Sequence, residues 1–409
     1  MSEGLHAEHA PMAVRSAALV VTVGVSSALH IGKLPVAIPV LRSDLGLSLV
    51  QAGFLLSLVQ LAGMAIGLMA GLSADRLGPR RIMLAGLLLL ACGSAAGAFA
   101  GDVQTLLWTR VLEGLGFLLA VLPAPALLRL CVRHPPTQAR FLGWWGAYMP
   151  VGTALALLLG APLIGWLGWR GLWLLLAGLS MLAAVALVST VPAHSVQGPP
   201  AQLRPRLRRT LTAAAPWWMA LAFFCYSGQW LAVVGFLPTI YSAAGVTGAA
   251  LGVLGALAAG VNMVGNIAAG RLLARGFGPG VVMGVGYLCM AAGAWGAFGA
   301  QGHPVWQYLA VLLFSCVGGL IPGTLFGLAV RLAPGPETVS TTVGWMQQWS
   351  SLGQFLGPPV VAWLAVRAGG WHWTWMVTGV SSLAGLCLAW RLQGAWAQVR
   401  HGAWSSRVD

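Results

Sequence analysis

The stretch Gly71-Leu72-Ser73-Ala74-Asp75-Arg76-Leu77-Gly78-Pro79-Arg80-Arg81 connects two long apolar runs, residues 48–72 and 82–100. A membrane-spanning helix needs about 20 mainly apolar residues, and both runs are close to or above that length. The connecting stretch carries four charged side chains, together with glycine and proline residues that end helices. We therefore predict two membrane helices joined by a short, basic loop.

The composition of the whole chain supports the same prediction. Of 409 residues, 58% are hydrophobic and 7% are charged, which leaves too little polar surface to cover a water-soluble globule. Twelve apolar runs occur in two sets of six: residues 16–40, 48–72, 82–100, 105–131, 140–167 and 171–191, then 216–244, 249–275, 280–300, 305–331, 340–367 and 371–392. The predicted fold class is an all-α integral membrane protein with 12 transmembrane helices in two six-helix, pseudo-symmetric bundles.

Polar segments divide the chain into five predicted parts. The longest polar stretch lies between the two sets of runs and holds Arg204, Arg206, Arg208 and Arg209. The five parts are a cytoplasmic N-terminal tail (residues 1–15), an N-terminal six-helix bundle (16–191), a cytoplasmic linker (192–215), a C-terminal six-helix bundle (216–392) and a cytoplasmic C-terminal tail (393–409).

The basic residues predict the orientation. With both termini on one side, 17 of the 22 Lys and Arg residues fall on that side, three fall on the other, and Lys33 and Arg110 lie inside the membrane. Because positively charged loops stay in the cytoplasm, we expect cytoplasmic termini and a location in the inner (plasma) membrane of a bacterium. The net charge of +14 therefore does not indicate a nucleic-acid partner.

The two sets of runs repeat one another. Three residues of the loop after the second run recur at offsets of 199, 199 and 200: Gly71, Arg76 and Pro79 as Gly270, Arg275 and Pro279. Two residues of the fifth run recur at an offset of 197: Pro162 and Trp166 as Pro359 and Trp363. A parallel repeat of six helices explains these matches.

Three motifs resemble those of one family of transporters. Residues 71–81 resemble the signature G-x-x-x-D-R-x-G-x-R-R of the major facilitator superfamily, and Arg110-Val-Leu-Glu113-Gly114-Leu-Gly116 is similar to its R-x-x-x-G-x-G element. Gly160-Ala-Pro162-Leu-Ile-Gly165 is similar to a helix-5 motif of its antiporters, with Ala161 interrupting the usual Gly-Pro pair. Residues 112–118 look similar to cyanate and nitroimidazole permeases. The resemblance implies the major facilitator fold, a monomer, and transport of a small molecule by alternating access.

Charged and helix-breaking residues predict a conformational gate. Asp75 at a helix end can pair with arginines and with helix termini, which would latch the cytoplasmic side. Arg76 and Arg80 belong to this predicted gate, and the alternative is that the arginines serve only as topology signals. Pro162 and Pro322 complete it. Pro322 lies in the run Gly318-Gly319-Leu-Ile-Pro322-Gly323, where a bend and close helix packing are both open.

Three charged residues lie in the interior of the membrane, away from the ends of the predicted helices: Lys33, Arg110 and Glu113. Each costs roughly 2.5–3.5 kcal/mol to insert, so each should face protein or a water-filled cavity. Arg110 and Glu113 are three residues apart and share a helix face. Their pair either only neutralises itself or responds to protonation, and we predict Glu113 and His30 as proton-coupling residues.

His30 and Lys33 also share a helix face, and their run contains no acid. If Arg110 already engages Glu113, Lys33 is uncompensated and can bind an anionic substrate, beside an imidazole that titrates near neutral pH. The alternatives are that Lys33 reaches a lipid headgroup or pairs with Glu113. We predict His30, Lys33 and Arg110 as substrate-binding residues.

Neutral side chains at comparable depth complete the predicted substrate site. They are Tyr148, Tyr226, Gln229, Asn262, Asn266 and Gln347. The two asparagines are the only ones in the chain and lie four residues apart, so a role in hydrogen bonds between helices is equally open.

The sequence lacks the motifs of an enzyme or an ATP-driven pump. Its single lysine is not part of a G-x-x-x-x-G-K-[ST] loop, and no acid pair, histidine cluster or Ser-His-Asp set recurs at one depth. We therefore predict no catalytic residue, metal site or cofactor, and an ion gradient as the energy source. Protons are favoured over sodium because no cluster of membrane carboxylates offers oxygen ligands.

The predicted function is secondary active transport. We expect proton-coupled symport that takes up a small organic or inorganic anion, such as a carboxylate or a cyanate-like solute. The partners are then this solute, protons and the lipid bilayer. The alternative is a proton-driven antiporter that exports drugs or metabolites, in which Glu113 would be the essential membrane acid.

Overall fold

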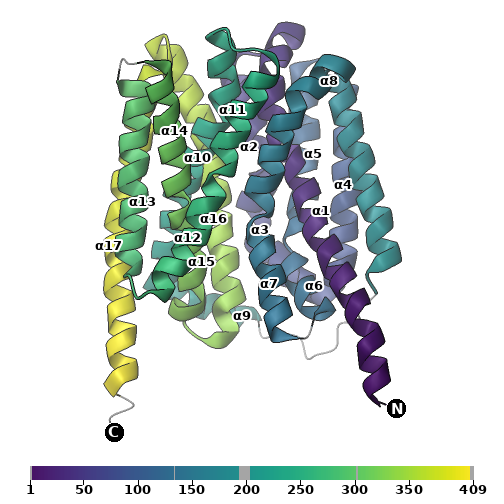
Figure 1. Cartoon of the computed structure of the whole chain (residues 1–409), viewed down its shortest axis with the longest axis vertical. Coiled ribbons are helices and arrows are strands. Elements are labelled where there is room, and N and C mark those ends of the chain that lie inside the picture. The colour runs from purple at the N-terminus through teal and green to yellow at the C-terminus, as the bar shows by residue number, and fades with distance from the viewer. Residues whose placement is uncertain (1, 133, 193–202, 301–302, 406–409) are drawn as a thin grey trace. The chain divides into compact units, whose positions relative to one another are not determined.

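The computed structural model describes residues 2–132, 134–192, 203–300 and 303–405, which form helices and no β-strand (Figure 1). The first half forms α1 (Ser2–Leu45), α2 (Leu49–Leu58), α3 (Leu61–Leu77), α4 (Pro79–Ala98), α5 (Val103–Val121), α6 (Ala124–Cys131), α7 (Pro135–Gly146) and α8 (Tyr148–Thr190). The second half forms α9 (Leu203–Thr212), α10 (Ala214–Ala243), α11 (Gly248–Gly260), α12 (Asn262–Ala274), α13 (Pro279–Ala294), η1 (Trp295–Gly299), α14 (Pro304–Gly318), α15 (Leu320–Leu332), η2 (Pro336–Thr338), α16 (Val339–Ala368), η3 (Trp371–Trp373) and α17 (Thr374–Ser405).

These helices build twelve membrane crossings in the described part of the chain. Ten stretches are long and apolar enough to cross a membrane. One of them, α8, has 43 residues and turns at Gly168, so it supplies two crossings. The less apolar α16, with 30 residues, supplies the twelfth. The predicted all-α membrane fold with 12 transmembrane helices is confirmed.

Left-handed glycines mark turns between crossings and recur in both halves. Gly46 and Gly245 have φ of 66° and 86° and lie 199 residues apart. Gly168 and Gly369 both have φ of 68° and lie 201 residues apart. Residues with a side chain rarely adopt such values, so glycine is required there. The backbone of the turns thus follows the repeat seen in the sequence.

The chain packs into two units. Unit 1 comprises residues 1–47, 69–200 and 241–256, and unit 2 comprises residues 48–68, 201–240 and 257–409. In unit 1, α1 packs along α8, and α4 packs against α5 and α8. In unit 2, α13 packs against α17, and α2 packs against α16. Each unit therefore includes a segment from the other half of the sequence, and the predicted bundle boundaries stay a prediction.

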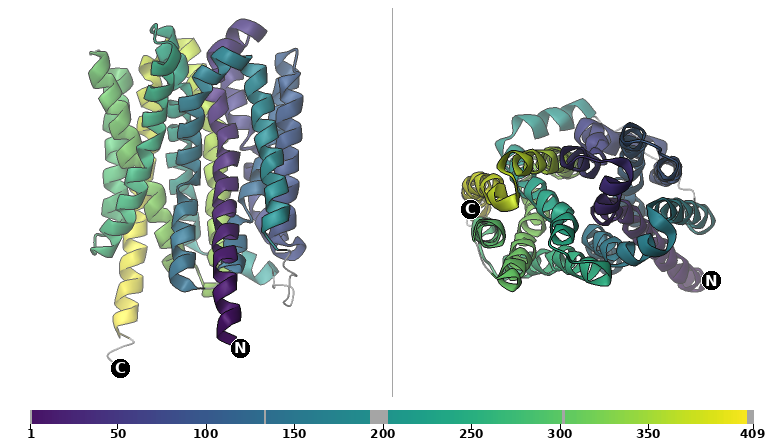
Figure 2. Two further views of the ribbon diagram at one scale, coloured as in Figure 1. Left: turned by 45° about the vertical axis from the view of Figure 1, so that its right-hand side comes forward. Right: turned by 90° about the horizontal axis from the view of Figure 1, so that it is seen from above.

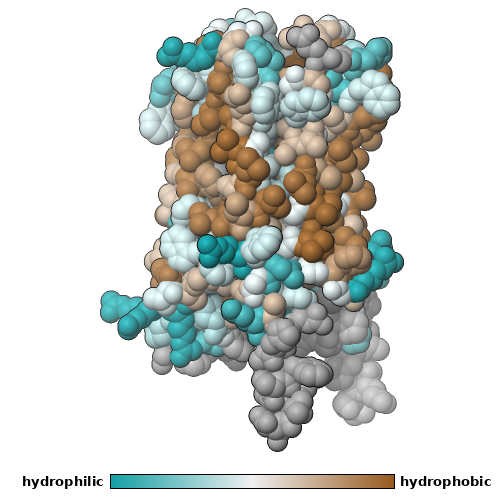
Figure 3. Space-filling view, turned by 90° about the vertical axis from the view of Figure 1, so that its left-hand side faces the viewer, coloured by the Kyte–Doolittle hydropathy of each residue, from teal (hydrophilic) through white to brown (hydrophobic). Residues whose placement is uncertain are grey.

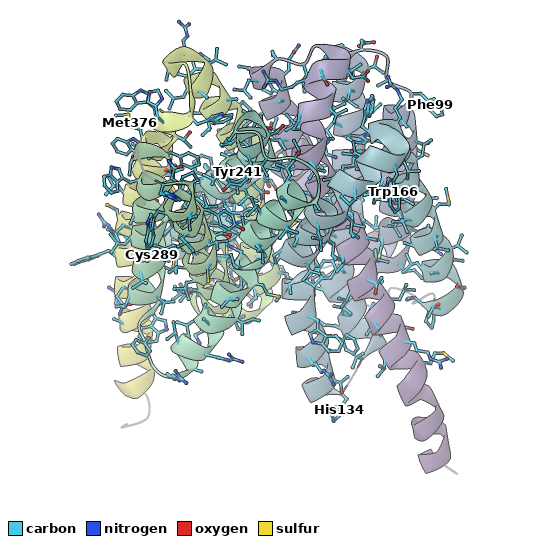
Figure 4. The ribbon with its side chains drawn as sticks, turned by 45° about the horizontal axis from the view of Figure 1, so that its top comes forward. Phe99, His134, Trp166, Tyr241, Cys289 and Met376 are labelled. Carbon is cyan, nitrogen blue, oxygen red and sulfur yellow. The ribbon has the colours of Figure 1, made fainter. Side chains whose placement is uncertain are left out.

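Exposed apolar side chains are suited to contact with lipid. Figure 3, which views the side of α13 and α17, shows hydrophobic side chains in a band between more hydrophilic ends. The large exposed apolar side chains on these two helices are Val281, Val285, Leu288, Met376, Val380, Leu383 and Trp390. In unit 1, Phe99 and Trp166, labelled in Figure 4, are 79% and 85% exposed. An exposed apolar surface of this kind is expected where the solvent is lipid.

Candidate functional site

Four side chains from α1 and α5 meet in the interior of unit 1, and we name them the charged cluster: His30, Lys33, Arg110 and Glu113. The Lys33 ammonium donates a hydrogen bond to Oε1 of Glu113, and the Arg110 guanidinium donates one to Oε2. Each of the four residues is at most 2% exposed. One buried carboxylate therefore holds two cationic side chains, one on each oxygen.

Helices α4 and α8 supply neutral partners for Lys33. Its Nζ also donates to Oγ of Ser94 at 2.9 Å and lies 4.2 Å from the ring centre of Trp173. Ser94 in turn donates to the backbone carbonyl oxygen of Trp173 at 2.8 Å. Because the face of an indole attracts a cation, a carboxylate, a hydroxyl and an aromatic ring together stabilise the buried ammonium.

Close helix packing allows these contacts. A Cβ atom at Gly93 of α4 would lie 2.9 Å from the backbone nitrogen of Glu113. A Cβ atom at Gly32 of α1 would lie 2.6 Å from Cβ of Ala156 in α8. Larger side chains at these two positions would push the helices apart, so the glycines allow α4 to approach α5 and α8 to approach α1.

His30 lies beside the carboxylate of Glu113. Its Nε2 is 2.9 Å from Oγ of Ser180, and its Nδ1 is 3.8 Å from Oε1 of Glu113. Among the residues that the structure describes, Nδ1 has no hydrogen-bond partner. The imidazole is thus anchored to the second arm of α8 and is adjacent to Glu113 without a hydrogen bond to it.

The expectation of an uncompensated Lys33 is wrong. The structure contains the alternative given above, a pair between Lys33 and Glu113. Helical spacing correctly placed Arg110 beside Glu113, but it could not show that the second carboxylate oxygen faces α1. The charged cluster still sums to one positive charge when His30 is neutral, because two cations share one anion.

Three residues of the site were missed by the sequence reasoning: Ser94, Trp173 and Ser180. They lie on the third and sixth crossings, where no charged residue drew attention to the helix interior. Serines in apolar runs are common, so their type alone indicates little. The available signal is the repeat between the halves. Ser382, on α17, lies 202 residues after Ser180, so a serine recurs at the equivalent position.

Polar residues of unit 2 form a separate, neutral network. Tyr226 and Asn262 exchange hydrogen bonds of 3.1 and 2.9 Å. Asn262 also donates to the backbone oxygen of Ser315 at 2.8 Å, and Asn266 donates to the amide oxygen of Asn262 at 3.0 Å. The bonds of Asn262 join α12 to α10 and α14, so this asparagine forms the hydrogen bonds between helices that the sequence left open, whereas Asn266 bonds within α12.

The other neutral residues of the predicted substrate site have separate contacts. Gln229 accepts a hydrogen bond from Oγ of Ser382 at 3.1 Å. Tyr148 stacks on Trp145, with ring centres 4.4 Å apart. Gln347 is half-buried on α16. No described hydrogen bond joins these residues to the charged cluster, and their role in substrate binding stays a prediction.

The residues of the predicted gate lie on several helices. Asp75 and Arg76 fall within α3, and their side chains lie outside the described residues. Arg80 donates to the backbone oxygen of Val188, near the end of α8, at 2.7 Å. Pro162 is exposed within α8, and the gating role of these residues stays a prediction.

The glycines around Pro322 pack closely against α12. A Cβ atom at Gly319 would lie 2.1 Å from the backbone oxygen of Asn262, and one at Gly323 would lie 2.6 Å from that of Asn266. Pro322 itself is buried in α15. The close-packing interpretation of this run therefore describes the structure, and a gate at Pro322 stays a prediction.

The second half repeats the packing around Glu113 with an apolar side chain. Just as Gly93 of α4 approaches the backbone nitrogen of Glu113, a Cβ atom at Gly293 of α13 would lie 3.0 Å from the backbone nitrogen of Phe314. The two glycines lie 200 residues apart, and Glu113 and Phe314 lie 201 residues apart. Phe314 is fully buried and occupies the position that is equivalent to Glu113.

The rest of the charged cluster has uncharged counterparts too. Val311 lies 201 residues after Arg110 and is its counterpart. On α1 the halves are offset by 199 residues, as Gly46 and Gly245 are. At this offset Ala232 is the counterpart of Lys33, and Gln229 is the counterpart of His30. Val311 and Ala232 are at most 2% exposed. The contact between His30 and Ser180 recurs between Gln229 and Ser382. The second half thus keeps the neutral hydrogen bond and lacks the charges.

A sequence profile of the Major Facilitator Superfamily matches residues 18–358, most of the chain. The chain belongs to the major facilitator superfamily. The resemblance of its loop and helix motifs is thereby confirmed at the level of the superfamily. This major facilitator protein is a multi-pass membrane transporter of a small molecule and not an enzyme.

Solved transporter structures share the fold. A bacterial homolog of the human lysosomal transporter Spinster, inward-facing and unoccupied, matches with a TM-score of 0.78 at 17% identity, over 95% of this chain and 98% of that chain. The xylose transporter XylE from E. coli, partially occluded and inward open, matches with a TM-score of 0.76 at 14% identity, over 93% and 98%. At these identities the likeness shows the fold alone.

Curated relatives in the superfamily differ in what their names describe. Multidrug resistance protein MdtH of Aeromonas hydrophila is 29% identical over 209 residues, 51% of this chain and 52% of that protein. Puromycin resistance protein pur8 of Streptomyces alboniger is 33% identical over 149 residues, 36% and 29% of the two chains. The 4-hydroxybenzoate transporter PcaK of Pseudomonas aeruginosa is 27% identical over 396 residues, 86% and 85% of the two chains. The chain thus matches about half or less of the first two relatives and most of the third.

Proposed function

We propose that this transporter takes up a small anion, a carboxylate or a cyanate-like solute, together with a proton. The charged cluster carries the proposal, because its counterparts in the second half are uncharged. The same helix packing forms around Ala232, Val311 and Phe314, so packing alone does not require the charges. Replacing a buried ion pair by apolar groups is often neutral or stabilising, and a role in transport therefore explains the charges better than stability does.

Charge balance links the anion to the proton. Lys33 and Arg110 are both bonded to Glu113, so a substrate carboxylate must compete with Glu113 for them. A proton on Glu113 removes its negative charge and leaves both cations for the substrate. By linkage, the bound anion increases the affinity of Glu113 for the proton by the same factor. One proton then crosses with one monoanion, and the cycle is electroneutral.

The proposal places each member of the charged cluster in the transport cycle. Lys33 and Arg110 bind the anion, Glu113 carries the proton, and His30 lies beside it. The sequence predicts further substrate contacts from neutral side chains, and these stay predictions: Tyr148, Tyr226, Gln229, Asn262, Asn266 and Gln347. The 4-hydroxybenzoate transporter, matched over 85% of its length, supports a carboxylate as the substrate.

A proton-driven antiporter that exports drugs or metabolites is the second candidate. Relatives named for multidrug and puromycin resistance match 51% and 36% of the chain. The helix-5 motif that begins at Gly160 also favours this function. In that case Glu113 would exchange its proton for a cationic substrate, and Lys33 would only hold the carboxylate in place.

Proton movement in proteoliposomes distinguishes the two candidates. With equal pH on both sides, we add 4-hydroxybenzoate or cyanate outside, and separately a lipophilic cation, and record the external pH. Symport predicts that only the anion raises the external pH. Lys33→Gln should lower the initial rate by about tenfold or more, and Glu113→Gln should abolish proton movement.

Liposomes without protein correct for passive diffusion of the undissociated acid. Release of protons on addition of the cation, unchanged in Lys33→Gln and lost in Glu113→Gln, would establish the antiporter instead. Anion uptake that is insensitive to Lys33→Gln would contradict the proposed binding site.

A further inference from the structure

We propose that one face of α9 binds the headgroups of anionic phospholipids. This face, which we name the α9 surface, consists of Arg204, Leu207, Arg208 and Leu211. It lies outside the charged cluster, and the inference does not depend on which solute is transported.

The position of α9 brings it to the end of a membrane crossing. Only Ala213 separates α9 from α10, which is long and apolar enough to cross a membrane. The indole Nε1 of Trp217 in α10 donates to the backbone oxygen of Leu211 at 2.8 Å, which fixes the end of α9 against the beginning of α10. Figure 2 shows α9 lying crosswise to the long helices of unit 2. A short helix in this place lies where headgroups meet the crossing.

The sequence of α9 is that of an interfacial helix. Leu207 and Leu211 lie four residues apart and form one apolar row. Arg204 and Arg208 are also four residues apart and border this row, and both are exposed. Leu211 is 36% exposed although it is apolar. Basic amphipathic helices of this kind lie in the plane of the interface, with leucines in the acyl boundary and arginines at the phosphates.

The charges of α9 divide into paired and unpaired ones. Arg209 donates to Oε1 of Glu337 at 2.7 Å. A backbone hydrogen bond and the Arg209 guanidinium hold the pKa of Glu337 below its ordinary value, so this carboxylate is ionised at neutral pH. Glu337 is the only carboxylate among the described side chains of unit 2. Arg204 and Arg208 have no ion pair or hydrogen bond within the described residues.

Anionic lipid is the occupant that this chemistry fits. Guanidinium groups bind phosphate oxygens with two parallel hydrogen bonds, and the cytoplasmic surface of a membrane is rich in such groups. A soluble polyanion would match the arginines alone. The leucine row between the arginines and the start of α10 matches the acyl chains of the same lipid as well.

The test uses the full chain in vesicles that contain a photoactivatable phosphatidylglycerol or, in parallel, a photoactivatable phosphatidylcholine. After illumination, the label on residues 203–217 is measured by mass spectrometry. Each arginine near an anionic surface contributes about fivefold in affinity, so Arg204→Gln with Arg208→Gln should lower labelling by phosphatidylglycerol by about tenfold or more. Arg209→Gln is the matched control and should change the labelling little, because Arg209 is already paired with Glu337.

Two results would overturn the inference. One is equal labelling by the two lipids in the wild type, which would mean that the surface contacts lipid without recognising charge. The other is labelling by phosphatidylglycerol that persists in the double variant, provided that its thermal melting equals that of the wild type.

Discussion

At the scale of single residues, the repeat provides a comparison for His30. Gln229 is hydrogen-bonded to Ser382 just as His30 is hydrogen-bonded to Ser180. An imidazole can take up a proton near neutral pH, whereas the amide of glutamine cannot. We expect His30→Gln to keep the bond to Ser180 and to leave the ratio of protons to substrate unchanged, since Glu113 carries the proton in the proposed cycle. The measurement is the number of protons taken up per anion in proteoliposomes.

The matched control is Ser180→Ala, which removes the same bond from its other end. If His30→Gln uncouples proton movement from anion uptake and Ser180→Ala does not, the imidazole itself carries the proton, as the spacing of His30 and Lys33 first indicated.

At the scale of elements, the packing of α5 on α4 is equivalent to that of α14 on α13. The variant with Lys33→Ala, Arg110→Val and Glu113→Phe copies the second half, and we expect it to fold with a melting temperature near that of the wild type and to be inactive. Glu113→Gln alone should lower the free energy of unfolding by about 3–5 kcal/mol, because it leaves two buried cations without their anion. Thermal melting followed by intrinsic fluorescence provides the comparison.

A triple variant that is less stable than Glu113→Gln would mean that the first half needs its charges for packing. The argument from the second half would then fail. Transport by the triple variant would show that the charged cluster is not the coupling site.

At the scale of the whole molecule, a parallel repeat makes a prediction about sidedness. Alkaline phosphatase fused after Gly46 or after Gly245 should be active. The two glycines are repeat partners and therefore lie on the same side, and this side is the periplasm because the basic loops lie on the opposite, cytoplasmic side. Fusions after Gly78 or Gly276, which are also left-handed, should be inactive. Activity that differs within either pair would contradict a parallel repeat, and reversed activity of both pairs would contradict cytoplasmic termini.

The sequence was sufficient for the crossings because each must cover the same apolar thickness, which run lengths reveal directly. It missed breaks within runs: residues 48–72 form α2 and α3, which are separated at Val59 and Gln60. Such breaks depend on packing against neighbours such as α16, which no local pattern encodes.

For the site, helical spacing predicted the contact between Arg110 and Glu113, which are three residues apart. It could not predict the contact between Lys33 and Glu113, which are 80 residues apart. That contact depends on how α1 and α5 pack against each other, which helical spacing within one run does not encode. Sequence patterns therefore found the charged residues, but they left the pair between Lys33 and Glu113 as only one of the alternatives for Lys33.

The paired left-handed glycines also bear on the history of the protein. Their backbone angles agree between the halves even where the side chains between them have become chemically different. This is the pattern that duplication of an ancestral half-length gene leaves behind, when turns are held constant and interiors diverge. The second half therefore offers equivalent positions for engineering a second charged cluster. Lysine at position 232, arginine at 311 and glutamate at 314 would give one carrier two coupling centres.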